Sequence, residues 1–460
     1  MIKLVSKEID LLHGNLLKKI IIFAIPVMLS GVLQLMFNAC DLIVVGKFAG
    51  DNALAAVGST GSLTSLMVNL FIGFSVGANV AVARSIGRKD KERCHDVVHT
   101  SLLFSFIIGV FLTIFGVLTA RFWLIKMDTN AEVLDQATLY LQIYFAGAIF
   151  NMLYNFGASI VRATGETKKP LYFLIVAGVT NVILNLIFVI VFDMGVAGVA
   201  IATVASQMIS SILILTYLAK LEGFVHFNFK DLKIDKSSLN EIILIGLPAG
   251  IQSSLFAISN VSIQTAVNSF NSTAVVAGNS ASNNIGGFIY TAMNSFYQAC
   301  ITFTSQNLGA RKVKNCKKVL IYCLCCVTVA GLLIGGIAVL FGEPLLNLYA
   351  NGDEAIKYGL TRLSIVGMSY FLCGIADVIV GGLRGLGYSI VPMTTSIIGV
   401  CGIRLLWIYT AFKHNHTLQT LYVSYPLSWG ITAIVHLVCY IVIYKKIFKK
   451  FSLKLGAVTE

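Results

Sequence analysis

The chain has 460 residues, of which 57% are hydrophobic and 12% are charged, and its mean hydropathy is +0.84. Soluble domains carry roughly 25% charged residues, so this composition excludes an ordinary soluble protein. The formal net charge is +13, which could indicate nucleic-acid binding. However, the basic residues form short clusters between long apolar runs, a pattern that membrane topology explains better.

Twelve long apolar runs follow one another along the chain. A run of about 20 apolar residues spans a bilayer as a helix, because only a helix satisfies its own backbone hydrogen bonds in lipid. The runs lie at about 20–45, 53–83, 97–120, 132–161, 170–192, 195–219, 241–267, 272–306, 318–341, 354–383, 390–412 and 418–444. They predict an all-α integral membrane protein with twelve transmembrane helices.

The basic residues predict the orientation of these helices. With the amino terminus inside, 27 of the 34 Lys and Arg residues fall on the inner side and six on the outer side, while Arg404 lies within a span. This asymmetry follows the positive-inside rule. We predict a multi-pass protein of the cell membrane (cytoplasmic or inner) with both termini cytoplasmic. The ten cysteines show no disulfide or zinc spacing, so we expect no metal site, and we expect no nucleic-acid partner.

The two halves of the chain repeat at an offset of 222 residues. Four of the six prolines pair at this offset, namely Pro26 with Pro248 and Pro170 with Pro392. Each half therefore holds six helices, and we predict two six-helix bundles related by a pseudo-two-fold axis along the membrane normal, as in alternating-access carriers. The predicted parts are the bundles 1–219 and 241–445, a cytoplasmic linker at 220–240 and a cytoplasmic tail at 446–460.

Two carboxylates lie deep within predicted helices. Acidic residues in the membrane are costly and are functional candidates by default, and Asp41 and Asp377 are the ones placed well inside spans. Gln34, Asn38 and Asp41 follow one another at spacings of four and three, so they share one face of the first helix. A polar stripe is unfavourable against lipid, and we expect this face to look into the bundle.

The fifth and sixth predicted helices offer matching oxygen ligands. Asn181 and Asn185 are four residues apart on one helix face, and Thr203 lies on the next helix. With Asp41 they supply the oxygens that a hard cation such as sodium prefers, and the carboxylate alone could take a proton. The alternative is that these side chains only hydrogen-bond across helices and bind no ligand.

Asp377 on the tenth predicted helix allows two interpretations. It could form a buried ion pair with Arg404, which would make it structural, or it could carry a proton or a cationic substrate. Its partner in the repeat is Asn155. We predict a substrate cavity lined by polar residues of both halves, namely Gln34, Asn38, Asn155, Gln252, Asn260 and Asp377.

Several longer motifs stand at the helix ends of both halves. They are FAIP at 23–26, DLIVVG at 41–46, ALAAVG at 53–58, RATGETK at 162–168, GVAGVAIAT at 195–203 and LRGLGY at 383–388. In these motifs, and in its 6 + 6 layout, the chain resembles the multidrug and toxic compound extrusion (MATE) transporters over essentially its whole length.

The resemblance implies an antiporter that is driven by sodium or protons and exports amphipathic, often cationic, organic compounds. It implies a cation site at Asp41, Asn181, Asn185 and Thr203. Some members instead use acids on helices 7 and 10; here helix 7 has only Glu241, at its mouth, and helix 10 has Asp377. We expect no enzymatic activity, no cofactor apart from the coupling Na⁺ or H⁺, contacts with membrane lipid, and a monomer.

Two other functions remain as alternatives. A flippase for a lipid-linked saccharide has a related fold, but its cavity should be rich in Arg and Lys, and only Arg404 is predicted inside a span. A membrane-embedded enzyme would need a catalytic cluster at membrane depth, and the sequence suggests none.

Overall fold

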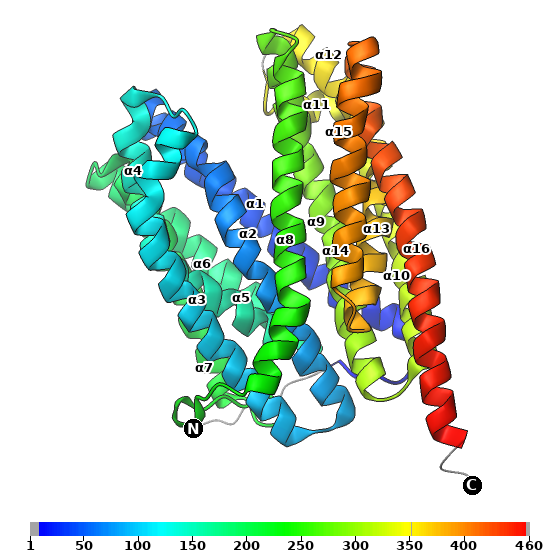
Figure 1. Ribbon diagram of the computed structural model, residues 1–460. Coiled ribbons are helices and arrows are strands. Elements are labelled where there is room, and N and C mark those ends of the chain that lie inside the picture. Colours follow the sequence, from blue (N-terminus) through cyan, green and yellow to red (C-terminus); the bar gives the residue numbers. More distant parts are fainter. Residues whose placement is uncertain (1–8, 351, 457–460) are drawn as a thin grey trace. The chain divides into compact units, whose positions relative to one another are not determined.

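The computed structural model describes residues 9–350 and 352–456, nearly all of them in helices (Figure 1). The predicted all-α membrane fold is confirmed. Among the described residues, ten helical segments are long and apolar enough to cross a membrane, and the bent pair α4 (Ala131–Ala146) and α5 (Ala148–Ala163) forms an eleventh. The remaining predicted span is α9 (Thr273–Gly309), which is 37 residues long but more polar than the others.

The helices form two compact units. Unit 1 contains Leu29–Gly250 together with Ile9, and unit 2 contains Asp10–Met28 and the chain from Ile251 onward. Two helices, α1 (Leu16–Phe48) and α8 (Lys236–Asn268), therefore pass from one unit to the other. Each does so two residues after a proline of the repeat, Pro26 or Pro248. Proline has no N–H, so each helix lacks an internal hydrogen bond near this boundary.

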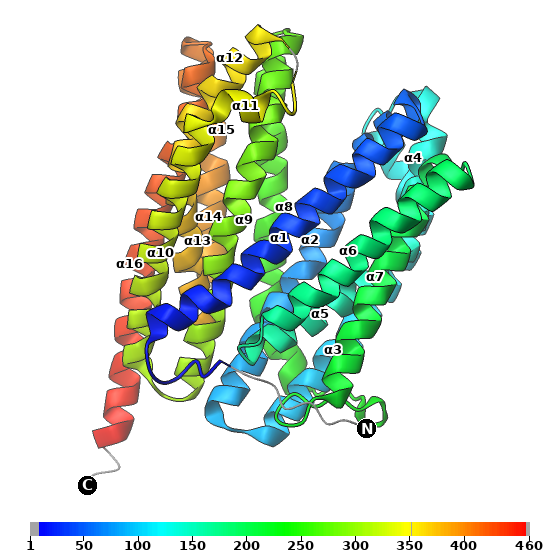
Figure 2. The same cartoon turned by 180° about the vertical axis from the view of Figure 1, so that it is seen from behind.

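Unit 1 is an all-helical body in which neighbours along the chain pack on each other. Figure 2 shows α6 and α7 side by side within it. Edge-to-face aromatic contacts run through its core, from Phe74 to Phe104 at 5.4 Å and from Phe104 to Phe156 at 6.4 Å between ring centres. Its remaining elements are α2 (Asp51–Arg88), α3 (Lys91–Lys126), α6 (Lys168–Leu186), the π-helix η1 (Ile187–Val191), α7 (Gly195–Lys220) and the 3₁₀ turn η2 (Phe229–Asp231).

Unit 2 is built in the same way but has more irregular helices. Two of its spans contain π-helical turns, which often mark functional positions, and its largest fully buried side chains include Tyr422 and Phe303. Besides α9, its elements are α10 (Val313–Leu340), α11 (Gly342–Leu346), α12 (Asp353–Arg362), η3 (Leu363–Gly367), α13 (Met368–Gly385), α14 (Ile390–Ser396), η4 (Ile397–Gly402), α15 (Ile403–Trp407), η5 (Ile408–Phe412) and α16 (Leu418–Gly456).

The repeat extends to the backbone conformation. Lys89 and Arg311, which are 222 residues apart, both adopt a left-handed conformation, with φ of 58° and 60°. Gly165 and Gly387 form a second such pair, with φ of 95° and 96°. Non-glycine residues rarely adopt positive φ, so the shared conformation at Lys89 and Arg311 indicates that both halves use the same turn.

A seam of four glycines joins α2 to the first part of α8 within unit 1. A Cβ atom added to Gly77 would overlap the carbonyl oxygen of Ile242, and one added to Gly246 would lie 2.5 Å from Cα of Phe74. Gly73 and Gly250 face each other in the same way. The two backbones are therefore in direct contact, which only glycine allows at these positions.

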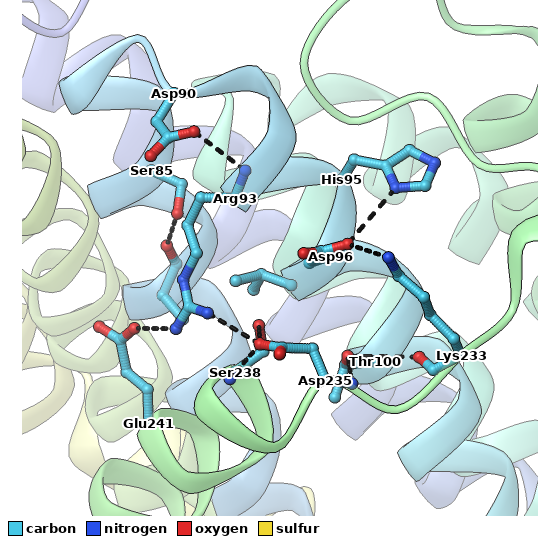
Figure 3. A network of polar contacts seen from close by, with 12 residues as sticks. Ser85, Asp90, Arg93, His95, Asp96, Thr100, Lys233, Asp235, Ser238 and Glu241 are labelled. Atoms are coloured by element: carbon cyan, nitrogen blue, oxygen red, sulfur yellow. Dashed lines mark hydrogen bonds and ion pairs between the residues drawn. The ribbon is translucent and has the colours of Figure 1, made fainter.

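An ion-pair network holds the start of α8 and the segment before it to the same unit (Figure 3). Arg93 contacts Asp235 at 2.8 Å and Glu241 at 3.2 Å, and Arg84 contacts Glu241 at 2.8 Å. Hydrogen bonds from the Ser238 hydroxyl and N–H, together with Arg93, lower the pKa of Asp235 below its ordinary value of 3.8. Residues 220–240, predicted as a linker, thus cluster with unit 1.

Candidate functional site

Close packing of α1 on α6 brings the predicted cation ligands together. A Cβ atom on Gly178 of α6 would overlap the ring of Phe37, so α1 approaches α6 closely at this level. One turn further along each helix lie Asp41 and Asn181. The end of α1 also packs against the start of α7 through an apolar cluster that includes Val45 and Val199, and Thr203 is one turn beyond Val199.

The four predicted ligands form one hydrogen-bonded cluster. The Asn185 side-chain nitrogen donates to Asp41 Oδ1 at 2.5 Å and to Asn181 Oδ1 at 3.3 Å. The Thr203 hydroxyl lies 3.3 Å from Asp41 Oδ2, and also 2.9 Å from the Val199 carbonyl. Asp41, Asn181 and Asn185 are buried, and Thr203 is half-buried.

This cluster is a buried carboxylate that accepts hydrogen bonds from two neutral side chains, the Asn185 amide nitrogen and the Thr203 hydroxyl. No ion pair within the described part of the chain involves Asp41, and the buried Oδ1 of Asn185 has no hydrogen-bond partner. A half-turn of that amide would exchange its nitrogen and oxygen and bring a further oxygen beside Asp41. Burying an uncompensated charge is costly, so the arrangement suits a bound cation or a proton.

The other predicted residues of unit 1 lie outside this cluster. Gln34 and Asn38 precede Asp41 on α1, and their side chains are exposed. Asn155 on α5 is half-buried and donates to the backbone oxygen of Asn151 at 2.9 Å. Of the predicted polar stripe on α1, only Asp41 is buried.

In unit 2 the predicted cavity residues contact arginines. Gln252 accepts a hydrogen bond from Arg384 at 2.8 Å, and Asn260 accepts one from Arg404 at 3.3 Å. Asp377 is half-buried, with the Cys373 sulfur 4.0 Å from its Oδ2. Among the described residues, no ion pair joins Asp377 to Arg404, so the structure does not support the interpretation of Asp377 as a structural partner of Arg404; Arg404 instead donates to Ser428 and Asn260.

Sequence reasoning missed two buried arginines. Arg362 and Arg384 were assigned to the outer and inner sides as topology signals, yet they are 2% and 4% exposed, like Arg404 at 4%. The prediction that only Arg404 lies inside a span is therefore wrong, because Arg362 and Arg384 both belong to the span Asp353–Gly385. Two signals could have found them: Arg362 lies within the predicted run 354–383, and Arg384 aligns with an arginine, Arg162, in the other half of the repeat.

Exposed polar residues also follow one face of the second helix of each half. On α2 they include Ser62 and Ser65, and on α9 they include Ser280, Asn283 and Asn284. The positions correspond, since Ser62 and Asn284 are 222 residues apart. A polar face on a spanning helix favours water over lipid, so α2 and α9 each have a face that suits an aqueous path.

Within the described chain, one group combines residue types that can bind a metal ion, two from α3 and one from η2. Ligand atoms of His95, His99 and Asp231 lie within 4.8 Å of one another. However, both ring nitrogens of His99 are engaged: Nδ1 contacts the His95 carbonyl at 2.8 Å, and Nε2 accepts the Asn228 N–H at 3.1 Å. The geometry favours a hydrogen-bonded anchor for the segment after α7.

A protein-family model described as MatE matches residues 26–187 and again residues 248–410. The two matched segments begin at Pro26 and Pro248, so each half of the repeat matches by itself. Together they cover well over half of the chain.

Several curated proteins are similar to this chain over most of their length. It is 28% identical over 438 residues to a probable multidrug resistance protein, YoeA, of Bacillus subtilis, covering 92% of this chain and 93% of YoeA. It is 25% identical over 412 residues to a probable multidrug resistance protein, NorM, of Thermotoga maritima, covering 86% of each. A FAD transporter of Shewanella oneidensis is 22% identical over 385 residues, covering 82% of this chain and 84% of that protein.

Solved structures share the fold. An outward-facing multidrug resistance MATE family transporter of the MOP superfamily has a TM-score of 0.90 at 23% identity, covering 97% of this chain and 100% of that one. A MATE structure in complex with MaL6 gives the same score and identity, covering 96% and 100%.

Proposed function

This chain belongs to the MatE family of multi-pass membrane transporters, and we propose that it is a cation-coupled antiporter that exports amphipathic organic compounds. Relatives named as multidrug resistance proteins support this class of substrate. Sodium or a proton would drive export by alternating access. We place the protein in the cell membrane with both termini cytoplasmic, and we propose that it works as a monomer.

The observation that carries this proposal is the cluster around Asp41. A carboxylate that is 8% exposed, without an ion-pair partner among the described residues, lies beside amide and hydroxyl side chains from two further helices. A cation bound there would neutralise the buried charge and replace the hydrogen bonds that now hold Asp41. Carboxylate, amide and hydroxyl oxygens are hard ligands suited to Na⁺, and the carboxylate alone suits H⁺.

Coupling follows if the two transport states bind the cation differently. The coordinating oxygens come from α1, α6 and α7, so cation binding stabilises one arrangement of these helices over another. If that arrangement is outward-open and holds substrate weakly, the ion gradient drives release outside. By linkage, substrate then weakens cation binding by the same factor.

The test is transport of ethidium, an organic cation, out of cells and into everted vesicles under an imposed Na⁺ gradient and then an H⁺ gradient. The variant Asp41→Asn should reduce export at least tenfold, because it removes the charge and keeps the side-chain shape. The matched control is Asp128→Asn, since Asp128 is exposed and has φ of 53°, a conformation that Asn adopts equally well.

Each result has a definite meaning. Export by wild type and by Asp128→Asn, but not by Asp41→Asn, supports the cation site, and the effective gradient identifies the ion. Normal export by Asp41→Asn refutes this site. Failure of wild type to export ethidium under either gradient refutes antiport of this organic cation and favours the lipid-saccharide flippase.

A further inference from the structure

The interior of unit 2 holds three arginines but little negative charge. Arg362, Arg384 and Arg404 are each at most 4% exposed, and no ion pair within the described residues joins any of them to a carboxylate. Between residues 251 and 456 the sequence has four acidic residues. Three of these are exposed and Asp377 alone is half-buried; the exposed ones are Glu343, Asp353 and Glu354.

Two of the arginines form a cluster around one aromatic ring. The guanidinium carbon of Arg404 lies 4.2 Å from the Tyr425 ring centre and 5.5 Å from that of Trp429, and that of Arg362 lies 5.7 Å from Tyr425. Cation–π contacts of this kind partly compensate a buried positive charge. They do not neutralise it, so the cluster remains positive.

Each of these two guanidinium groups donates to one buried serine and to one exposed side chain. Arg404 donates to Asn260 at 3.3 Å, and Arg362 donates to Asn283 at 3.1 Å. Both asparagines are exposed, and each presents an amide oxygen to the arginine. A guanidinium group has five N–H donors, and the buried Nε of Arg362 has no partner. An incoming oxyanion would find unused donors here.

The repeat shows that the charges of Arg362 and Arg404 have no counterpart in the first half, whereas Arg384 aligns with an arginine there. Arg404 aligns with Val182 in the first half, and Arg362 aligns with Tyr140. Conversely, Asp41 of the cation cluster aligns with Ile263 in the second half. The two halves have thus diverged to opposite buried charge on a shared helical framework.

We propose that the Arg362–Tyr425–Arg404 cluster of unit 2 binds the oxyanion group, phosphate or carboxylate, of a soluble organic anion. The exposed amide oxygens of Asn260 and Asn283 occupy the places that ligand oxygens take on binding. That this ligand is exported cargo rests on the proposed antiport, and it adds organic anions to the substrate classes of this transporter.

The test is binding of flavin mononucleotide to the purified full-length protein in detergent, measured by equilibrium dialysis. Riboflavin is the matched neutral probe, because it lacks only the phosphate. A hydrogen bond to a charged group contributes about 1.5–3 kcal/mol, so flavin mononucleotide should bind at least about tenfold more tightly than riboflavin. Equal affinity for the two probes overturns the proposal.

The decisive variant is Asn260→Asp. It keeps the side-chain shape but places an internal carboxylate against Arg404, so it should abolish the preference for flavin mononucleotide while thermal stability is retained. Arg404→Gln should have the same effect on binding. The control Arg121→Gln removes an exposed arginine of unit 1 that pairs with Asp135, and it should leave binding unchanged. If Asn260→Asp keeps the preference, the arginine is merely structural and the proposal fails.

Two further measurements separate this proposal from its alternatives. Ethidium export by wild type tests antiport separately: if wild type exports no ethidium but binds flavin mononucleotide at least tenfold more tightly than riboflavin, the antiport proposal fails and the oxyanion site stands. Displacement of flavin mononucleotide by nanodiscs containing phosphatidic acid, but not by nanodiscs of neutral lipid, would assign the cluster to a lipid headgroup and overturn its role in binding soluble cargo.

Discussion

Replacing Gly77 with alanine tests the seam between α2 and α8. The added Cβ would overlap the Ile242 carbonyl oxygen and lie 3.0 Å from the Gly246 nitrogen. Both are backbone atoms of a helix, which cannot move aside as a side-chain tip can. Overpacking of this kind costs about 1–3 kcal/mol, while alanine returns up to about 1 kcal/mol of helix propensity.

The control Gly61→Ala gains the same helix propensity without overpacking, because Gly61 lies on the same helix and a Cβ there meets nothing within 4 Å. The difference between the variants is then the overpacking cost of about 1–3 kcal/mol. At about 2–4 °C per kcal/mol for a body of this size, Gly77→Ala should unfold about 2–12 °C below Gly61→Ala.

The assay is thermal unfolding in detergent, followed by a thiol-reactive fluorophore. Cys94 is fully buried in unit 1, so labelling of this residue, identified by mass spectrometry, reports the opening of that unit. If the two variants unfold within about 1 °C of each other, the backbones are not in contact along this seam and the reasoning is refuted.

Two further predictions concern the polar residues near the start of α8 and of α3. The variant Ser238→Ala removes the main cause of the low pKa of Asp235. A carboxylate whose pKa is lower in the folded than in the unfolded protein stabilises the fold at pH values above its unfolded pKa, near 3.8 here. This stabilisation is lost as the pH falls through the folded pKa. Hydrogen exchange of residues 232–240 should therefore accelerate at a higher pH in the variant than in wild type, and identical profiles would contradict this. Added Zn²⁺ should leave the unfolding temperature unchanged, because both nitrogens of His99 are engaged; a saturable rise that His95→Ala abolishes would contradict this.

The sequence predicted well what depends on chain order and helix-face spacing. Eleven of the twelve predicted spans are helical segments that are long and apolar enough to cross a membrane, because an apolar run of about 20 residues indicates a span by itself. The twelfth, α9, is helical but more polar. Asn181 and Asn185 lie together because a spacing of four defines one helix face. That Asp41 and Thr203 meet them required the resemblance as well, since spacing within one helix says nothing about which helices are neighbours.

The arginines of unit 2 show what the sequence could not supply. Arg384 stands in the last turn of α13, next to a loop, where a basic residue ordinarily signals topology. Its burial depends on Tyr297 and Gln252 from two other helices. Sequence alone also could not decide whether Asp377 and Arg404 form an ion pair. Such a pair requires both side chains to face each other, and the rotation of each helix is set by packing against other helices.

The passage of α1 and α8 from one unit to the other also bears on biosynthesis. The glycine seam of unit 1 needs Gly246 and Gly250, so this unit cannot complete its packing until the ribosome has made more than half of the chain. Conversely, residues 16–28 are among the first to be made but pack against residues made much later. One of these is Phe303, whose ring centre lies 5.6 Å from that of Phe23. Cutting the chain in the 220–240 segment would therefore yield two fragments that each lack part of a helix of their own unit. Neither fragment could complete the packing of its unit alone.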